Sequence, residues 1–264
     1  MVIEIFWLSI LLGLVSGLLA GLFGIGGGLV IVPVLAFLFR AQGFPADLVM
    51  LMAVATSLAT IMLTALSSVW AHHRLGSVVW PKVLRLSPGI MTGAALGAVV
   101  AKHISADMLR IILAVFLVVV AIQMAMQLKP KPDQVQQSRL MDFLAANSIG
   151  LLSSIVGIGG GTLTVPYLVH GQMLMRNAVA VASACGLPIA VAGTVSYAFL
   201  GLHVLHLPEW SLGYVYLPAF LGTGLSSIAT APIGAKLVHR LPAAKLKRYF
   251  SLLLLVMAAK LLWY

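Results

Sequence analysis

Apolar residues run through this chain in ten stretches that short polar segments separate. The stretches cover residues 3–23, 29–39, 46–70, 78–101, 107–128, 140–156, 161–169, 177–200, 210–235 and 243–262. Several of them reach the roughly 20 residues that an α-helix needs to cross the hydrocarbon core of a bilayer. Strands of a membrane barrel would alternate polar and apolar residues, and these stretches do not. The pattern predicts an all-α polytopic membrane protein.

The order of stretch lengths (long, short, long, long, long) occurs twice. Residues 17–35 are identical to residues 150–168 at 11 of 19 aligned positions. Both copies contain the pentapeptide Gly-Ile-Gly-Gly-Gly at their centre, and a proline follows each pentapeptide after four residues, at Pro33 and Pro166. The chain is therefore predicted to be a tandem duplication whose repeated centre interrupts an apolar segment.

Between the two copies lies a polar segment that contains proline and charged residues, which indicates a solvated loop. We predict a first transmembrane repeat over residues 1–128, a cytoplasmic linker over 129–139 and a second transmembrane repeat over 140–264. The two short segments, 29–39 and 161–169, fit either a re-entrant half-helix or a tilted crossing. With either alternative, both ends of each predicted hairpin lie on one side of the membrane.

The glycine runs predict breaks in the helices at membrane depth, because each glycine costs about 1 kcal/mol relative to alanine. In lipid such a break is tolerated only where it is buried in protein or lines a cavity. The short helix after each run would begin at the break, and a glycine-lined helix N-terminus is a ready anion site. The alternative is that these glycines let helices pack closely. The candidate substrate-binding glycines are Gly24, Gly26, Gly27, Gly28, Gly157, Gly159, Gly160 and Gly161.

Lysine and arginine are distributed unevenly between the predicted loops. One face of the membrane receives 12 of the 16 basic residues, 11 of them in loops at 71–82, 129–139, 170–176 and 236–248 and the twelfth, Arg85, just after the first of these loops. Basic loops favour the cytoplasm, so both termini are predicted to lie outside. The first hairpin then opens outward and the second inward. This predicts two inverted-topology repeats, each a glycine-broken helical hairpin plus three transmembrane helices, which is typical of secondary transporters.

Composition supports this class of protein. The 264 residues are 61% hydrophobic and 8% charged, whereas soluble domains carry about 25% charged residues. A net charge of +10 would suggest nucleic acid as the partner of a soluble protein, but here the basic residues set the orientation and no nucleic acid is expected. The N-terminal stretch lacks the positively charged region of a signal peptide, so it is interpreted as part of the first helix.

Hydroxyl and thiol groups supply further candidates. At an offset of 127 residues, Thr56 aligns with Ser183 and Ser57 aligns with Ala184. Hydroxyls at mid-membrane can bond an anion or can bond back to the preceding helical turn. Thr162 and Thr164 follow the second glycine run, where the first repeat has Leu29 and Ile31, so the site would be asymmetric. The single cysteine, Cys185, is either a substrate contact or a small buried hydrophobe.

Ionisable residues argue against a cation as cargo. The six acidic residues fall at segment ends or in loops, whereas buried carboxylates mark proton relays and cation sites in transporters. His203 and His206 have the spacing of a metal pair on a helix, but a third ligand is not evident, so neither a metal nor a cofactor is predicted. The coupling ion, H⁺ or Na⁺, and a homo-oligomeric state are left open.

These features together resemble the sulfite exporter TauE/SafE family. The resemblance rests on the paired glycine-rich hairpins, on Ala55-Thr56-Ser57 in the following helix, and on Gly97-Ala98 and Gly234-Ala235. It covers the whole chain, with Ser183-Ala184 departing from the expected Thr-Ser. It implies a permease of the bacterial inner membrane for small anions, often sulfur-containing, such as sulfite, thiosulfate or sulfonates, or for small organic acids.

The leading hypothesis is therefore a transporter, not an enzyme, that passes a small anion by alternating access, with the two halves rocking around a central site. Backbone N–H groups of the glycine runs and hydroxyls of Thr56, Ser57, Thr162 and Ser183 would bind the anion. The alternatives are an anion channel with the same site, a membrane-embedded thiol-dependent protein using Cys185, and a subunit of an assembly that does not itself transport.

Overall fold

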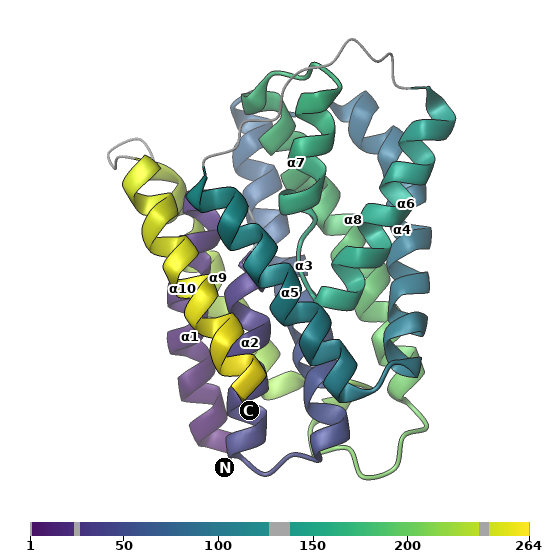
Figure 1. Cartoon of the computed structure of the whole chain (residues 1–264), viewed down its shortest axis with the longest axis vertical. Coiled ribbons are helices and arrows are strands. Elements are labelled where there is room, and N and C mark those ends of the chain that lie inside the picture. Colours follow the sequence, from purple (N-terminus) through teal and green to yellow (C-terminus); the bar gives the residue numbers. More distant parts are fainter. Residues whose placement is uncertain (1, 24–26, 127–137, 238–242, 264) are drawn as a thin grey trace.

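The computed structural model describes residues 2–23, 27–126, 138–237 and 243–263. Ten helices and one two-stranded ribbon occur in these ranges (Figure 1). Their bounds are α1 Val2–Phe23, α2 Gly28–Ala41, α3 Ala46–Arg74, α4 Trp80–His103, α5 Ala106–Ala125, α6 Arg139–Val156, α7 Gly161–His170, α8 Met175–Gly201, β1 Ser211–Leu212, β2 Val215–Tyr216, α9 Leu217–Leu237 and α10 Ala243–Trp263.

Six helices of the described part are long and apolar enough to cross a membrane: α1, α3, α4, α5, α6 and α8. The predicted all-α polytopic membrane protein is confirmed. Nearly every residue of α3 from Leu48 to Ile61 is buried, whereas α1, α4 and α5 expose large apolar side chains along one side, as lipid-facing helices do. The long helices run roughly parallel to one axis, with α3 in the middle of the molecule (Figure 1).

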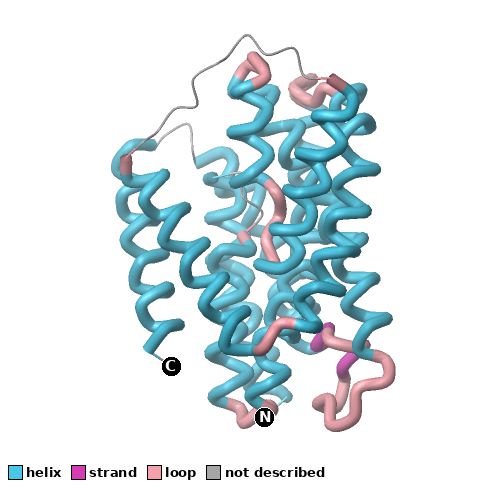
Figure 2. The backbone as a smooth tube through the Cα atoms, turned by 45° about the vertical axis from the view of Figure 1, so that its right-hand side comes forward, coloured by secondary structure: helices cyan, strands magenta, loops and turns pink. Residues whose placement is uncertain are grey.

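The predicted helical segment 210–235 begins before the helix that the structure shows there. Residues 210–216 belong to a loop and to the β1–β2 ribbon at the lower end of the molecule, and α9 starts only at Leu217 (Figure 2). Trp210 has φ 66° and Gly213 has φ 54°, so the backbone turns where a continuous helix was predicted. A short apolar run fits a buried strand as well as a helix, and hydrophobicity alone does not distinguish them.

The two hairpins enter the molecule from opposite ends. The connection between α6 and α7 lies at mid-height, and the outer ends of both helices lie at the upper end (Figures 1 and 2). The start of α1 and the end of α2 lie at the lower end (Figure 1). With 14 and 10 residues, α2 and α7 are roughly 21 and 15 Å long, less than the bilayer core of about 30 Å. The short segments are therefore re-entrant, and their opposite directions are those that inverted repeats require. The repeat relationship itself stays a prediction.

Helices are exchanged between the two sequence halves. The helix that opens each hairpin packs against the fourth helix of the other half, so α1 contacts α9 and α6 contacts α4. The pairs α3–α8 and α5–α10 also join one half to the other. The packing units are thus not the segments 1–128 and 140–264.

Glycine allows the exchanged pairs to approach closely. A Cβ atom on Gly93 of α4 would lie 2.0 Å from the Asn147 carbonyl oxygen of α6, and one on Gly13 of α1 would lie 2.3 Å from the Thr223 carbonyl oxygen of α9. Backbones this close leave no room for a side chain, as is common where membrane helices pack through small residues.

Replacing Gly93 by alanine should destabilise the α4–α6 pair, because the new methyl group would overlap backbone atoms that cannot move aside. Overpacking of this kind costs about 1–3 kcal/mol, so the melting temperature in detergent should fall by several degrees. Gly186→Ala is the matched control, since its Cβ would meet only Ala65 Cβ at 4.0 Å. Equal melting temperatures for the two variants would contradict this account of the packing.

Candidate functional site at the hairpin tips

The tips of the two hairpins touch each other inside the molecule. A Cβ atom on Gly28, the first residue of α2, would lie 2.7 Å from the carbonyl oxygen of Gly157 and 2.9 Å from Cα of Ile158. Both neighbours are backbone atoms of the second tip. The two breaks are thus brought together, and glycine is required at position 28 for this approach.

Ser57 ties the second tip to α3. Its buried hydroxyl donates a hydrogen bond of 2.8 Å to the carbonyl oxygen of Gly157. Gly157 is the C-cap of α6, with φ 75°, in the left-handed region that glycine adopts without strain. Because α6 ends there, its last carbonyl groups need partners from elsewhere, and Ser57 supplies one. Ser57 therefore lies at the second tip, and its hydroxyl donor is used by the protein.

Thr56 faces a different part of the structure. Its hydroxyl oxygen accepts a hydrogen bond of 3.0 Å from the backbone N–H of Tyr216 in β2. The Tyr216 ring packs edge-on against Phe39 and Phe44, at centroid distances of 5.5 and 5.2 Å. Thr56 thus anchors the ribbon at the lower end to α3.

Ser183 does not lie beside Thr56, although the two align in sequence. Helices α3 and α8 are antiparallel, and a Cβ on Gly193 would lie 2.7 Å from Leu58 while one on Gly186 would lie 4.0 Å from Ala65. Extending this register puts Ser183 level with Ser68, roughly 18 Å along the helix from Thr56 at about 1.5 Å per residue. The predicted grouping of these hydroxyls in one central site is therefore not what the structure shows.

The second tip has a polar lining. Helix α7 begins at Gly161 with Gly160 as N-cap, and the Gly161 N–H donates to the Gly159 carbonyl. A Cβ on Gly160 would lie 3.0 Å from Oγ1 of Thr164 and 3.6 Å from Ile149 of α6. Thr164 is fully buried, and its hydroxyl has no hydrogen-bond partner among the described residues.

Thr162 and Ser153 carry two more hydroxyls without a partner in the described residues. Thr162 is half-buried and lies two residues from Thr164, so the two side chains point to opposite sides of α7. Ser153 is fully buried and follows Ile149 by four residues, which puts it on the face of α6 that contacts the second tip.

The first tip has apolar side chains where the second tip has hydroxyls. A Cβ on Gly27 would lie 3.1 Å from the backbone oxygen of Ser16, 3.4 Å from Ile31 and 3.5 Å from Ala20. At an offset of 133 residues, Gly27 matches Gly160, Ile31 matches Thr164 and Ala20 matches Ser153. Gly24 and Gly26, which were predicted to bind substrate, lie outside the described residues.

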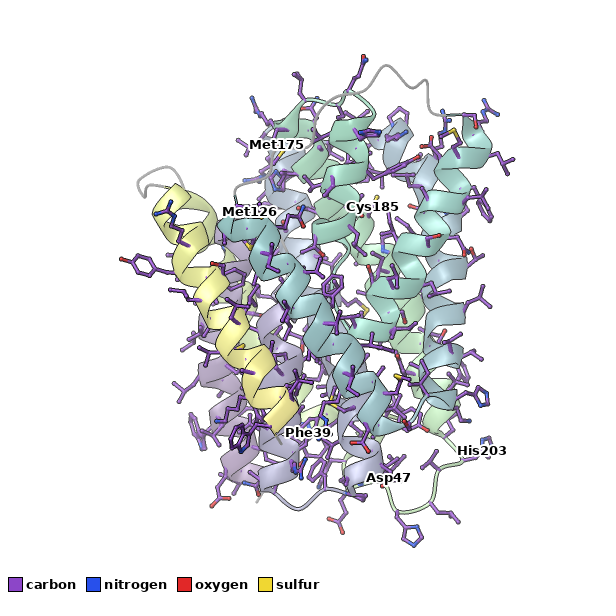
Figure 3. The ribbon with its side chains drawn as sticks, viewed as in Figure 1. Phe39, Asp47, Met126, Met175, Cys185 and His203 are labelled. Carbon is purple, nitrogen blue, oxygen red and sulfur yellow. The ribbon has the colours of Figure 1, made fainter. Side chains whose placement is uncertain are left out.

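Cys185 lies inside the bundle on α8 and is completely buried, whereas His203 lies on the loop at the lower end (Figure 3). Within the described residues, no group of three or more His, Cys, Asp or Glu side chains is arranged to hold a metal ion. The thiol is four residues from Ile189, which contacts the second tip, so Cys185 shares that face of α8.

Comparison with known proteins identifies the family. Residues 9–261 match the family described as Sulfite exporter TauE/SafE. The chain belongs to this family. It is similar to a "Probable membrane transporter protein" of Haemophilus influenzae, with 38% identity over 254 residues that cover 95% of this chain and 96% of the relative.

Other TauE/SafE-like relatives are more distant. Identity is 27% to a "Probable membrane transporter protein" of Methanocaldococcus jannaschii, over 95% of this chain and 92% of that protein. It is also 27% to YunE of Bacillus subtilis, over 88% and 91%. No solved structure gives a significant match. The predicted family and the predicted multi-pass membrane transporter are confirmed.

This TauE/SafE chain also holds a buried ion cluster that the sequence did not reveal. Asp142, in the first turn of α6, is fully buried, and its carboxylate accepts hydrogen bonds from Lys82 Nζ at 2.8 and 2.9 Å. Arg85 of α4 pairs with the same carboxylate, and the Tyr167 hydroxyl of α7 donates to it at 2.6 Å. The cluster joins three helices at the upper end, α4, α6 and α7.

The sequence correctly placed Asp142 at the end of an apolar segment, but it did not predict that Lys82 and Arg85 pair with this carboxylate. Lys82 and Arg85 lie about 60 residues earlier in the chain. Their spacing of three residues puts them on one face of a helix, yet nothing in the sequence says which helix packs against that face. The pairing follows from the exchange of α4 and α6 between the halves.

Removing the Asp142 carboxylate should strongly destabilise this member of the TauE/SafE family. Asp142→Ala removes the fully buried carboxylate that Lys82, Arg85 and Tyr167 share, and breaking a buried pair costs about 3–5 kcal/mol. Asp107→Asn is the control, because the Asp107 side chain is 79% exposed in its pair with Arg110 and such surface pairs contribute about 0–1 kcal/mol. Thermal unfolding in detergent measures both changes, and an Asp142 variant as stable as the Asp107 variant would refute the structural role of the cluster.

Proposed function

We propose that this protein is a secondary transporter that moves a small anion across the bacterial inner membrane by alternating access, with the anion handled where the two hairpin tips meet. The contact of Gly28 with Gly157 and Ile158 is the observation that carries the proposal. Interrupted helices that meet at mid-membrane are how many secondary transporters build their substrate sites.

The electrostatics of the tips favour an anion. Both α2 and α7 begin at a tip, so the positive ends of two helix dipoles face the same region. Neither helix has a side-chain cap. The N–H groups of Val30 and Leu163 donate to the carbonyls of Gly27 and Gly160, which leaves those of Leu29 and Thr162 in the first turns for a ligand. Asp142, the one buried carboxylate in the described chain, is already compensated by Lys82 and Arg85.

The chemistry of these donors fits sulfite, thiosulfate, sulfonates and small carboxylates, all of which present oxygen atoms to N–H and O–H groups. The family description points to sulfite among these anions. H⁺ or Na⁺ as coupling ion is compatible with the same arrangement, since a protonated substrate or an unwound carbonyl group requires no buried carboxylate.

Alternating access in this fold involves exchanged bundles rather than sequence halves. The glycine-mediated contacts make α1 with α9, and α4 with α6, the closest-packed helix pairs, so each pair moves as a unit. The crossing of α3 and α8 lies between the two pairs and provides the axis about which they rock. The tips open alternately to the upper and lower ends.

The upper end is proposed to face the cytoplasm. The basic residues of the described chain at that end are Arg74, Lys82, Arg85, Arg139, Arg176 and Arg248, and those at the lower end are Arg40, Lys102, Arg110 and Lys260. This imbalance is in the direction of the positive-inside rule. Both termini would then lie on the outer side.

Cysteine labelling tests this orientation. In a Cys185→Ala background, Leu205→Cys in the lower loop and Leu174→Cys in the upper loop introduce thiols at positions that are 79% and 74% exposed. A membrane-impermeant maleimide should label Leu205→Cys in intact cells and Leu174→Cys only after permeabilisation. The reverse pattern would overturn the proposed orientation without affecting the fold.

Gly28→Ala tests the proposed site. The methyl group would collide with backbone atoms of the second tip, so uptake and efflux of sulfite, thiosulfate, sulfoacetate and acetate in proteoliposomes should be abolished. Gly186→Ala, with open space around its Cβ, should transport normally at an equal protein level in the membrane. Normal flux in Gly28→Ala would exclude the tips as the transport site, and conductance far above carrier rates would identify a channel instead.

A further inference from the structure

We infer that the anion is bound at the second hairpin tip alone, by the hydroxyls of Thr164 and Ser153 together with the backbone N–H of Thr162 in the first turn of α7. This inference rests on the proposed transport of an anion and specifies which of the two tips binds it. It makes Thr164 and Ser153 residues that determine specificity, one on each helix of the second hairpin.

The hydroxyls themselves are the first part of the argument. More than nine-tenths of buried polar groups in proteins have a hydrogen-bond partner, so each exception calls for an explanation such as a ligand. Thr164 and Ser153 are both fully buried, and neither hydroxyl has a partner in the described residues. A donor left unpaired in an apolar interior is costly, and a bound anion would satisfy it.

Geometry is the second part. The Thr164 Oγ1 atom lies 3.0 Å from the place of a Cβ on Gly160, so it is directed at the N-terminus of α7. Ile149 lies 3.6 Å from the same place, and Ser153 follows one turn later on the same face of α6. The nearest atom to that place is Cδ1 of Ile189, at 2.5 Å, so α8 closes the tip on its apolar side. The start of α7 and the Thr164 hydroxyl thus meet beside Gly160, and helical spacing puts Ser153 on the α6 face that is turned toward them.

Comparison of the two tips is the third part. Around Gly27 the matching positions hold Ile31 and Ala20, whose side chains lie 3.4 and 3.5 Å from the place of a Cβ. The nearest atom to that place is the backbone carbonyl oxygen of Ser16, at 3.1 Å, and the Ser16 hydroxyl donates to Gly13. The nearest neighbours of Gly27 therefore offer an anion no side-chain donor, whereas Thr164 offers a hydroxyl beside Gly160.

Other hydroxyls of the region are excluded by the same geometry. Ser154 Oγ lies 3.4 Å from the place of a Cβ on Gly193, so it faces α8 instead of the tip. Ser57 already donates to Gly157, and Thr56 accepts from Tyr216 at the ribbon. Thr164 is the fully buried hydroxyl that lies beside Gly160, and Ser153 is the fully buried hydroxyl on the α6 face next to it.

Thr164→Val is the decisive variant, because valine has the shape of threonine without the hydroxyl. Loss of one hydrogen bond to a charged ligand should raise the KM for thiosulfate or sulfite, or the Kd by calorimetry, about tenfold or more. Thr164→Ser should restore much of the affinity. Ile31→Val, the matched change at the first tip, should leave affinity unchanged, and titration of the unmodified protein should give one anion per chain.

Thermal unfolding separates binding from folding. Without ligand, Thr164→Val should melt at or above the temperature of the unmodified protein, since an unpaired buried hydroxyl has been removed. With thiosulfate at constant ionic strength, the stabilisation seen in the unmodified protein should be lost.

The possible outcomes distinguish this inference from the proposed function. If the unmodified protein binds and transports an anion and Thr164→Val does so equally well, the hydroxyls hold water and the inference fails while the proposed function stands. Equal losses in Ile31→Val and Thr164→Val would refute the one-sided site. If the unmodified protein neither binds nor moves any anion of the panel, the proposed function fails and the inference with it.

Discussion

The requirement that every backbone polar group find a partner away from water is the constraint on which this structure depends. A helix satisfies it internally, but the hairpin tips do not, because α6 ends and α7 begins in the middle of the molecule. The Ser57 hydroxyl meets part of this demand at the Gly157 carbonyl. What the protein leaves unmet, at the start of α7, is available to a ligand. The same interruption between α6 and α7 thus creates backbone groups that the protein must bond and backbone groups that a ligand can bind.

Each hairpin is held in place because helices of one sequence half pack against helices of the other half. Neither α2 nor α7 is long enough to cross a bilayer, and each is held by a neighbour, α3 or α8, whose residues are largely buried. A duplicated chain could give the molecule two equivalent ends, but the upper and lower ends differ. Asp142, Lys82 and Arg85 make an ionic junction at the upper end, whereas Ser9, which matches Asp142 at an offset of 133 residues, is a buried serine whose hydroxyl has no partner in the described residues. A duplicated scaffold therefore carries one-sided features at its tips and at its ends.

Much of this could be predicted from one sequence. Repeated glycine runs located both hairpins, and apolar lengths gave the class of fold and nearly all helix bounds. Position along the chain did not give register between helices, which is why Ser183 was grouped with Thr56. Helices α3 and α8 are antiparallel, so residues that align in the two repeats lie far apart along the helices. They come close together only near the point where the two helices cross. The pairing of Asp142 with Lys82 and Arg85 was inaccessible for a related reason, since it depends on which helices are neighbours. The ribbon at 211–216 was missed because its apolar residues fit a helix equally well.

The contact between α1 and α9 also has a consequence for biosynthesis. Gly13 and Gly17 of α1 lie against backbone atoms of Thr223 and Ser227, about two hundred residues later in the chain. During vectorial synthesis, α1 therefore enters the membrane about two hundred residues before its partner α9. Until α9 is inserted, the glycine face of α1 is without the helix that packs against it in the folded protein, and insertion of α9 completes this helix pair.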